Sequence, residues 1–248
     1  MMNKRNQKIL GINMFKKIVL LTILASNIGI RAQTTDPIKS HQQLQAKIKT
    51  AITTEFGSHD EQSPLLAKAI EMACDFYDTT NIESTQKCND TQACTFAVQA
   101  LRYAHNTMQI DAFYYIAFTA IMFFEQSHEN ALLLIVTHAN NNQDDDTIDV
   151  EEYPEIKNMI TQKMGSSPES ERCMICAANC IKKGVPLHDV ISLTTLITTS
   201  HITDEADYID QAYYLYFAAT RYFNETHESA MGLIEFCLEL DSSSYIKE

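Results

Sequence analysis

The chain has no tryptophan and is poor in the residues that build tight turns, with six Gly and five Pro among 248 residues. Folds made of many short strands need such turns. No run of strand length alternates apolar and polar positions with β-branched side chains. Long segments are instead rich in Ala, Leu, Ile, Met, Glu, Gln and Lys, which favour helices. The composition therefore predicts an all-α fold.

Acidic residues are absent from residues 1–32. This segment has several Lys and Arg residues near its start, continues with the apolar run Ile18–Ile30 and reaches the small residue Ala32. That order is typical of a secretory signal peptide. We expect cleavage near Ala32 and an exported chain, periplasmic or secreted. Met14 begins a second complete signal pattern, and a retained membrane anchor is the alternative, although the run is short for a bilayer.

Positive charge is scarce after this segment. The sequence has 19 Lys and Arg against 32 Asp and Glu. Six of the basic residues lie within residues 1–32, which leaves 13 against 32 and a net charge of −19 for the mature chain. A surface of this sign repels phosphate backbones and anionic lipid headgroups. The charge argues against nucleic acids and, after cleavage, membranes as partners, and it is also what a soluble, solvated surface needs.

Two parts of the sequence repeat each other. Ile110–Ile135 and Ile209–Ile234 align without gaps and share an Ile-Asp start, a Tyr pair, a His-Glu pair and a Leu-Ile end. Upstream, IKTAITTEFGS from Ile48 is similar to IKNMITQKMGS from Ile156. A unit of about 100 residues therefore occurs twice.

Helical periodicity predicts five helices in each unit. They are expected near 41–56, 63–78, 91–106, 111–125 and 128–140, and near 152–164, 168–183, 188–200, 204–223 and 227–240. Gly57 and Gly165 can end a helix in the left-handed conformation. Ser127 and Thr226 are expected N-caps. The units span 40–140 and 152–241, with an acidic polar linker at 141–151 and a tail at 242–248.

The last helix pair of each unit resembles a tetratricopeptide repeat. The second copy reads AYYLYFAATRYFNETHESAMGLIEFCLELDSS, with aromatic Tyr214, Phe217 beside small Ala218, and Ala230 after a short turn. Small residues let two antiparallel helices approach closely while aromatics fill the space around them. The resemblance implies an α-solenoid-like stack in which 128–140 covers 152–164. It also implies a protein or peptide interaction module that needs no cofactor.

Three cysteines share one helix face. Cys173, Cys176 and Cys180 follow the helical period of CMICAANC, which favours packed thiols, with disulfide or metal use as alternatives. Export into an oxidising compartment favours disulfides. Cys88 and Cys94 flank a loop and are the candidate local pair.

The His-Glu pairs invite comparison with zinc proteases. Such a site needs a second His one helical turn after His128 or His227, and those positions hold Leu132 and Met231. We therefore interpret the pairs as helix starts rather than metal ligands.

The alternative function is a metal-dependent hydrolase using Asp144, Asp145 and Asp146. The segment from Glu129 to Ile148 resembles the apolar helix and Asp-rich, metal-binding turn of ADP-ribosylglycohydrolases, which implies Mg²⁺ or Ca²⁺ ligands. Asn140–Asn142 stand where that turn has glycines, and a polar linker is expected between two units. No phosphate loop or nucleophile elbow occurs, so we predict no catalytic residues and no bound metal.

Overall fold

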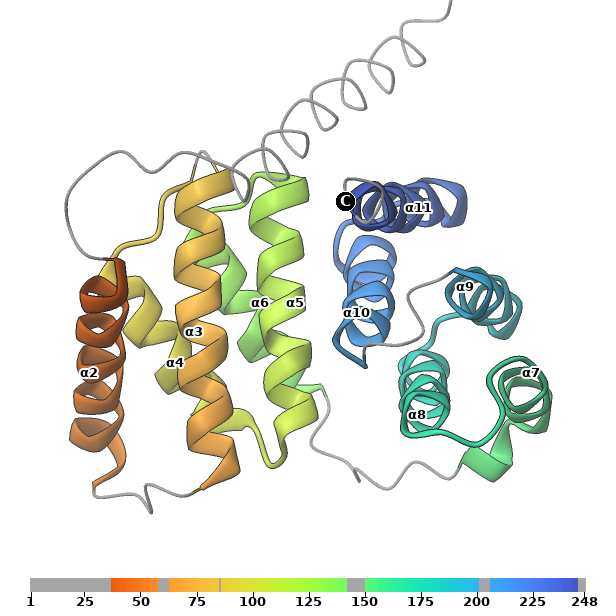
Figure 1. Cartoon of the computed structure of the whole chain (residues 1–248), viewed down its shortest axis with the longest axis horizontal. Coiled ribbons are helices and arrows are strands. Elements are labelled where there is room, and N and C mark those ends of the chain that lie inside the picture. The colour runs from red at the N-terminus through yellow and green to blue at the C-terminus, as the bar shows by residue number, and fades with distance from the viewer. Residues whose placement is uncertain (1–36, 58–62, 85, 142–149, 201–205, 245–248) are drawn as a thin grey trace, which may run out of the picture.

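The computed structural model describes residues 37–57, 63–84, 86–141, 150–200 and 206–244, and within these ranges it contains ten α-helices, one 3-10 turn and no strand (Figure 1). The first half consists of α2 (Pro37–Phe56), α3 (Pro64–Glu83), α4 (Asp90–Tyr103), α5 (Thr107–Phe124) and α6 (His128–Asn140). The second half consists of η1 (Val150–Glu152), α7 (Pro154–Met164), α8 (Pro168–Lys182), α9 (Leu187–Thr199), α10 (Ala206–Tyr222) and α11 (His227–Ser244). The predicted all-α class is confirmed.

Glycines and N-cap hydroxyl groups mark several of the helix ends. Gly57 and Gly165 follow α2 and α7 with positive φ angles of 82° and 70°, which glycine adopts without strain. The Ser127 and Thr226 hydroxyls each accept a hydrogen bond, at 3.2 Å, from the backbone N–H three residues later. Each bond satisfies one of the free amides in the first turn. All four residues therefore lie at helix ends as predicted, although Gly165, with a ψ of −150°, has a positive φ without the left-handed helical conformation.

Corresponding helices pack in the same order in both halves. In the first half α3 packs on α2, α4 and α5, and α6 packs on α4 and α5. In the second half α8 packs on α7, α9 and α10, and α11 packs on α9 and α10. The buried positions also agree in register: Ile48, Ala69, Ala93 and Ile135 correspond to Ile156, Cys173, Val190 and Ile234.

The two halves meet through α5 and α10 (Figure 1). The two helices run side by side in the same direction. At their C-terminal ends, the rings of the equivalent residues Phe124 and Phe223 stack with centroids 4.0 Å apart. Tyr214 of α10 belongs to the core of the first half, and Ile116 and Phe123 of α5 belong to the core of the second. We call this contact the seam.

The seam differs from the contact that the sequence predicted. A continuous stack would place α6 on α7, and among the described residues these helices are not packed together. In each half the helix with the longest run of buried residues, α5 or α10, lies at this contact, and each is covered partly by the other. Within the described residues α5 is also the one helix long and apolar enough to cross a membrane, but 67% of it is buried inside the protein.

Candidate functional site

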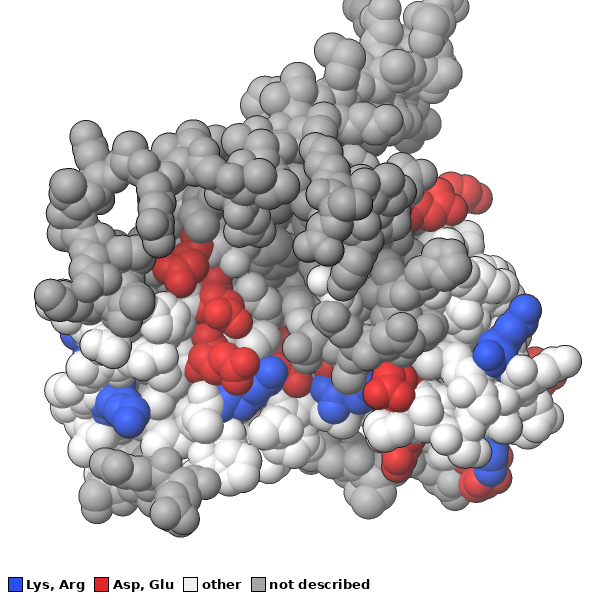
Figure 2. Space-filling model, viewed as in Figure 1, with Lys and Arg blue, Asp and Glu red and all other residues white. Residues whose placement is uncertain are grey.

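The outer side of α3 carries an exposed acidic face formed by Glu71, Asp75 and Asp78. Their spacing of four and three residues places the carboxylates on one side of the helix. Figure 2 shows acidic side chains gathered in a line over the region of α3. Partial burial raises the pKa of Asp75, and repulsion from Glu71 and Asp78 adds to the shift. The face therefore holds like charges close together, which favours a positively charged partner.

A cavity of about 180 Å³ opens beside this face, between α2, α3 and the start of α4. Its wall includes Tyr77 and Asp78 of α3. Asp78 belongs to both the acidic face and the cavity. The remaining lining residues are His41, Gln43, Leu44, Lys47 and Asp90. An open cavity next to an exposed charged face is the arrangement expected of a binding site rather than of a packed core.

A buried charged cluster lies at the seam. Arg172 of α8 donates from Nε to Asp210 Oδ1 at 2.7 Å and also pairs with Asp210 Oδ2. Its Nη2 lies 3.1 Å from Asp111 Oδ2 in the other half. Lys68 Nζ lies 3.1 Å from Asp111 Oδ1. Asp111 and Asp210 are almost completely buried, at 4% and 1% exposure. The four side chains therefore join α3, α5, α8 and α10.

The cluster contains residues at corresponding positions of the two halves. Lys68 and Arg172 occupy corresponding places on α3 and α8, as Asp111 and Asp210 do on α5 and α10. Burial raises the pKa of Asp111 to about 6, while Lys68 and Arg172 oppose the shift. Lys68 is within ion-pair distance of Asp111 Oδ1, but this oxygen has no well-directed hydrogen bond among the described residues. We interpret the cluster as the polar part of the seam, since the charges neutralise one another.

His138 also crosses the seam. Its Nδ1 lies 2.8 Å from the Tyr222 hydroxyl, and its Nε2 lies 3.2 Å from Lys183 Nζ. Burial holds its pKa well below the usual value, and Lys183 adds to the shift. In the tetratricopeptide pattern this position is usually small. The structure shows that the larger ring fills space between α6 and the second half.

The two histidines of the repeated His-Glu pairs have different surroundings. His227 Nδ1 lies 2.7 Å from the Tyr216 hydroxyl and 3.3 Å from Asp189 Oδ1. In the first half, Ala117 and Gln92 occupy the places of those two partners. His128 Nε2 is buried there without a hydrogen-bond partner among the described residues.

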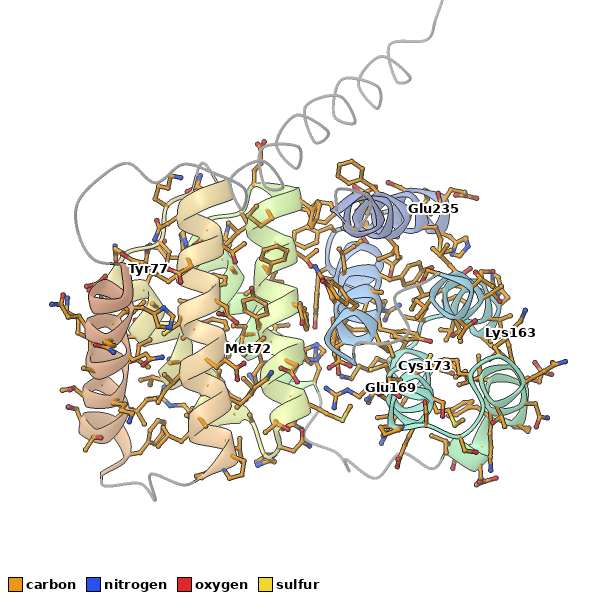
Figure 3. All side chains as sticks on the ribbon, viewed as in Figure 1. Met72, Tyr77, Lys163, Glu169, Cys173 and Glu235 are labelled. Atoms are coloured by element: carbon orange, nitrogen blue, oxygen red, sulfur yellow. The ribbon has the colours of Figure 1, made fainter. Side chains whose placement is uncertain are left out.

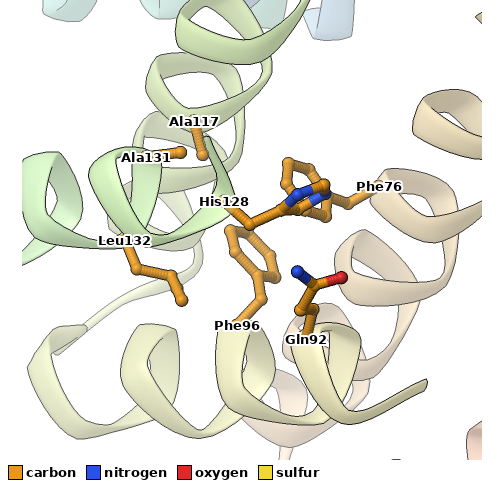
Figure 4. A pocket seen from close by; sticks show the side chains of 7 residues that line it. All are labelled: Phe76, Gln92, Phe96, Ala117, His128, Ala131 and Leu132. Atoms are coloured by element: carbon orange, nitrogen blue, oxygen red, sulfur yellow. The ribbon is translucent and has the colours of Figure 1, made fainter. Parts of the chain in front are cut away.

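The pocket around His128 is narrow (Figure 4). Phe76 and Phe96, which stack with centroids 4.8 Å apart, form part of its wall beside His128. The remaining gap does not admit a water molecule. Burial lowers the pKa of His128, which keeps the ring neutral. This pocket is therefore a consequence of core packing, and no ligand fits it as it stands.

The predicted thiol positions lie in described helices or next to them. Cys173, Cys176 and Cys180 are buried, which confirms that they pack in the core. Burial raises the pKa of Cys173 to about 11 and that of Cys180 to about 12, so neither thiol is reactive. Cys88 and Cys94 are both free thiols in the structure, and their pairing stays a prediction.

The aspartates Asp144, Asp145 and Asp146, like the proposed signal segment 1–32, lie outside the described residues. Within the described ranges, no group of three or more His, Cys, Asp or Glu side chains is placed to hold a metal ion. No residue in the described part of the chain therefore supports the alternative hypothesis of a metal-dependent hydrolase.

Sequence reasoning did not identify the seam cluster or the cavity. A signal for the cluster was present, because the repeated Ile-Asp start of each stretch contains Asp111 and Asp210. An acidic residue at the head of an otherwise apolar helix indicates a buried partner of opposite charge. The cavity combines residues from three helices and leaves no local pattern.

Comparisons of the chain with protein-family models, with curated proteins and with solved structures find no match.

Proposed function

We propose that the protein is an exported helical module that binds a basic protein or peptide through the acidic face of α3. The observation that carries the proposal is the alignment of Glu71, Asp75 and Asp78 on one exposed side of a helix, next to an open cavity. Complementary charge speeds the encounter with a basic partner and disfavours acidic ones. The strongly negative net charge acts in the same direction over longer distances.

The proposal includes two tandem copies of one five-helix unit. The matching helix order and burial register of the halves support a duplication, and the resemblance to tetratricopeptide repeats supports an interaction role. Antiparallel helices stack within each copy, as in an α-solenoid, and the copies meet through α5 and α10. The composition of residues 1–32 supports export.

The acidic face can be tested by neutralising two of its charges. We expect the double variant Glu71→Gln/Asp75→Asn to bind a fluorescein-labelled peptide of alternating Lys and Ser about fivefold more weakly than the parent, since exposed charge pairs each contribute roughly 0.2–1 kcal/mol. Fluorescence anisotropy at low and moderate salt measures the affinity. Asp78 is left unchanged so that the cavity keeps its carboxylate.

The matched control is Glu152→Gln/Glu155→Gln, which removes the same charge from exposed positions at the other end of the molecule. We expect it to change the affinity less than twofold, because attraction to a distant part of the surface is largely screened by salt. An equal loss in both variants would mean that the peptide responds to net charge alone and that α3 is not the binding face.

A further inference from the structure

The cavity beside α3 has an apolar floor and a polar rim. Leu44 of α2, only 5% exposed, forms part of the floor, and the Tyr77 ring forms one side. Figure 3 shows Tyr77 on the side of α3 that faces α2. The carboxylates of Asp78 and Asp90 line the same space. A ligand would therefore meet apolar surface with one end and negative charge with the other.

The charges in the cavity do not balance when His41 is neutral. Lys47 forms an ion pair with Asp90. Asp78 Oδ2 lies 3.4 Å from His41 Nδ1, and this contact is an ion pair only when the imidazole is protonated. With a neutral His41, one ammonium group faces two carboxylates, and the cavity carries one net negative charge. The site therefore favours a monocation.

The second half does not reproduce this chemistry. Its core residues match those of the first half, yet the places of Lys47, Tyr77, Asp78 and Asp90 are taken there by Glu155, Ile181, Lys182 and Leu187. The sign of the charge is reversed at two positions, and the aromatic ring is lost. Among the described residues, this combination of an aromatic ring, two carboxylates and one ammonium is therefore confined to the first half.

We propose that this cavity binds the alkylammonium end of a lysine side chain. The cavity volume of about 180 Å³ is many times the space that one water needs, so it admits four methylenes and one ammonium. The methylenes would lie against Leu44 and Tyr77, and the ammonium would donate to Asp78. The inference rests on the proposed function, because the lysine belongs to the basic partner of the α3 face.

The test uses n-butylammonium as the probe and n-butanol as its neutral control, added to the full mature protein and followed by NMR. We expect saturable shifts of the Leu44 methyl and Tyr77 ring signals with the amine and none with the alcohol. Asp78→Asn should weaken the amine about tenfold, since a charge-assisted hydrogen bond is lost. His41→Lys should also abolish saturation, because it places an ammonium beside Asp78 within the protein. Both positions are at least one-third exposed, so both variants should fold.

Glu71→Gln is the control in this experiment, since it changes the acidic face without touching the cavity, and it should leave the amine affinity unchanged. Shifts that never saturate, or that Asp78→Asn leaves intact, would overturn the proposal. The amine could bind saturably while the Glu71→Gln/Asp75→Asn variant binds the peptide as tightly as the parent does. That result would support the cavity site and reject the acidic face as the peptide-binding surface. If the double variant binds the peptide more weakly but the amine does not bind saturably, the acidic face is supported and the cavity site is rejected.

Discussion

At the scale of single residues, the equivalent pair His128 and His227 shows how the surroundings decide the contribution of a side chain. We expect His128→Phe to raise the free energy of unfolding by about 1 kcal/mol, because a buried nitrogen without a partner is removed. His227→Phe should lower it by roughly 1–3 kcal/mol, because Tyr216, fully buried, loses its hydrogen bond. Urea unfolding of both variants at pH 7 measures the two values.

The opposite signs are the informative part of this prediction. The same substitution is made at equivalent positions, so the difference between the variants reports the partners rather than the size of the ring. Equal destabilisation by both would show that His128 makes a stabilising contact that its geometry does not reveal.

At the scale of elements, Arg172 connects α8 to both α5 and α10. We expect Arg172→Met to lower the free energy of unfolding by about 3–5 kcal/mol, because it leaves Asp210 buried without its guanidinium. Cys176 donates to Asp210 from its thiol at 3.1 Å but supplies no charge. Lys68→Met should cost less, since Asp111 keeps its contact with Arg172. Guanidinium chloride unfolding gives both values.

A double variant separates the charge from the packing. In Arg172→Met/Asp210→Leu the buried carboxylate disappears with its partner, and most of the lost stability should return. A double variant as unstable as Arg172→Met alone would show that the side chain of Arg172 matters through its packing, not through the buried charge that it neutralises.

At the scale of the whole molecule, the seam joins the halves more closely than a linker between independent domains would. Each half contributes side chains to the core of the other, such as Tyr214 and Ile116. The halves share their interior along α5 and α10, whereas end-to-end stacking would bury the last helix of one against the first of the next. The two halves of the chain therefore pack face to face, and the acidic face lies on the first half.

Export also concerns the whole chain. If residues 1–32 are a signal peptide, protein isolated from its native source should begin within a few residues of Gln33, because the signal peptidase cleaves after a small residue such as Ala32. Intact-mass measurement decides this. A mature chain that still starts at Met1 or Met14 would contradict the proposed localisation, although it would leave the binding face untouched.

The helices were predictable because their causes are local. Gly57, Gly165, Ser127 and Thr226 act through their own backbone or through residues one turn away, so the sequence shows the boundaries directly. The similar burial register of the halves goes with the similar apolar patterns of Ile110–Ile135 and Ile209–Ile234. The candidate site was not predicted, because the residues that line its cavity come from three helices.

What the sequence determined by itself was therefore the helical class, the start of most helices and the repeated sequence pattern. The predicted end of the second helix near residue 78 was wrong, because α3 continues to Glu83. The tertiary structure alone decided how the halves meet, because α6 on α7 and α5 on α10 both bury apolar surface and no local signal chooses between them. It also decided which charges are buried together, such as Asp111 with Arg172, and where a cavity stays open. These features depend on residues far apart in the chain, whose proximity follows from the packing of whole helices.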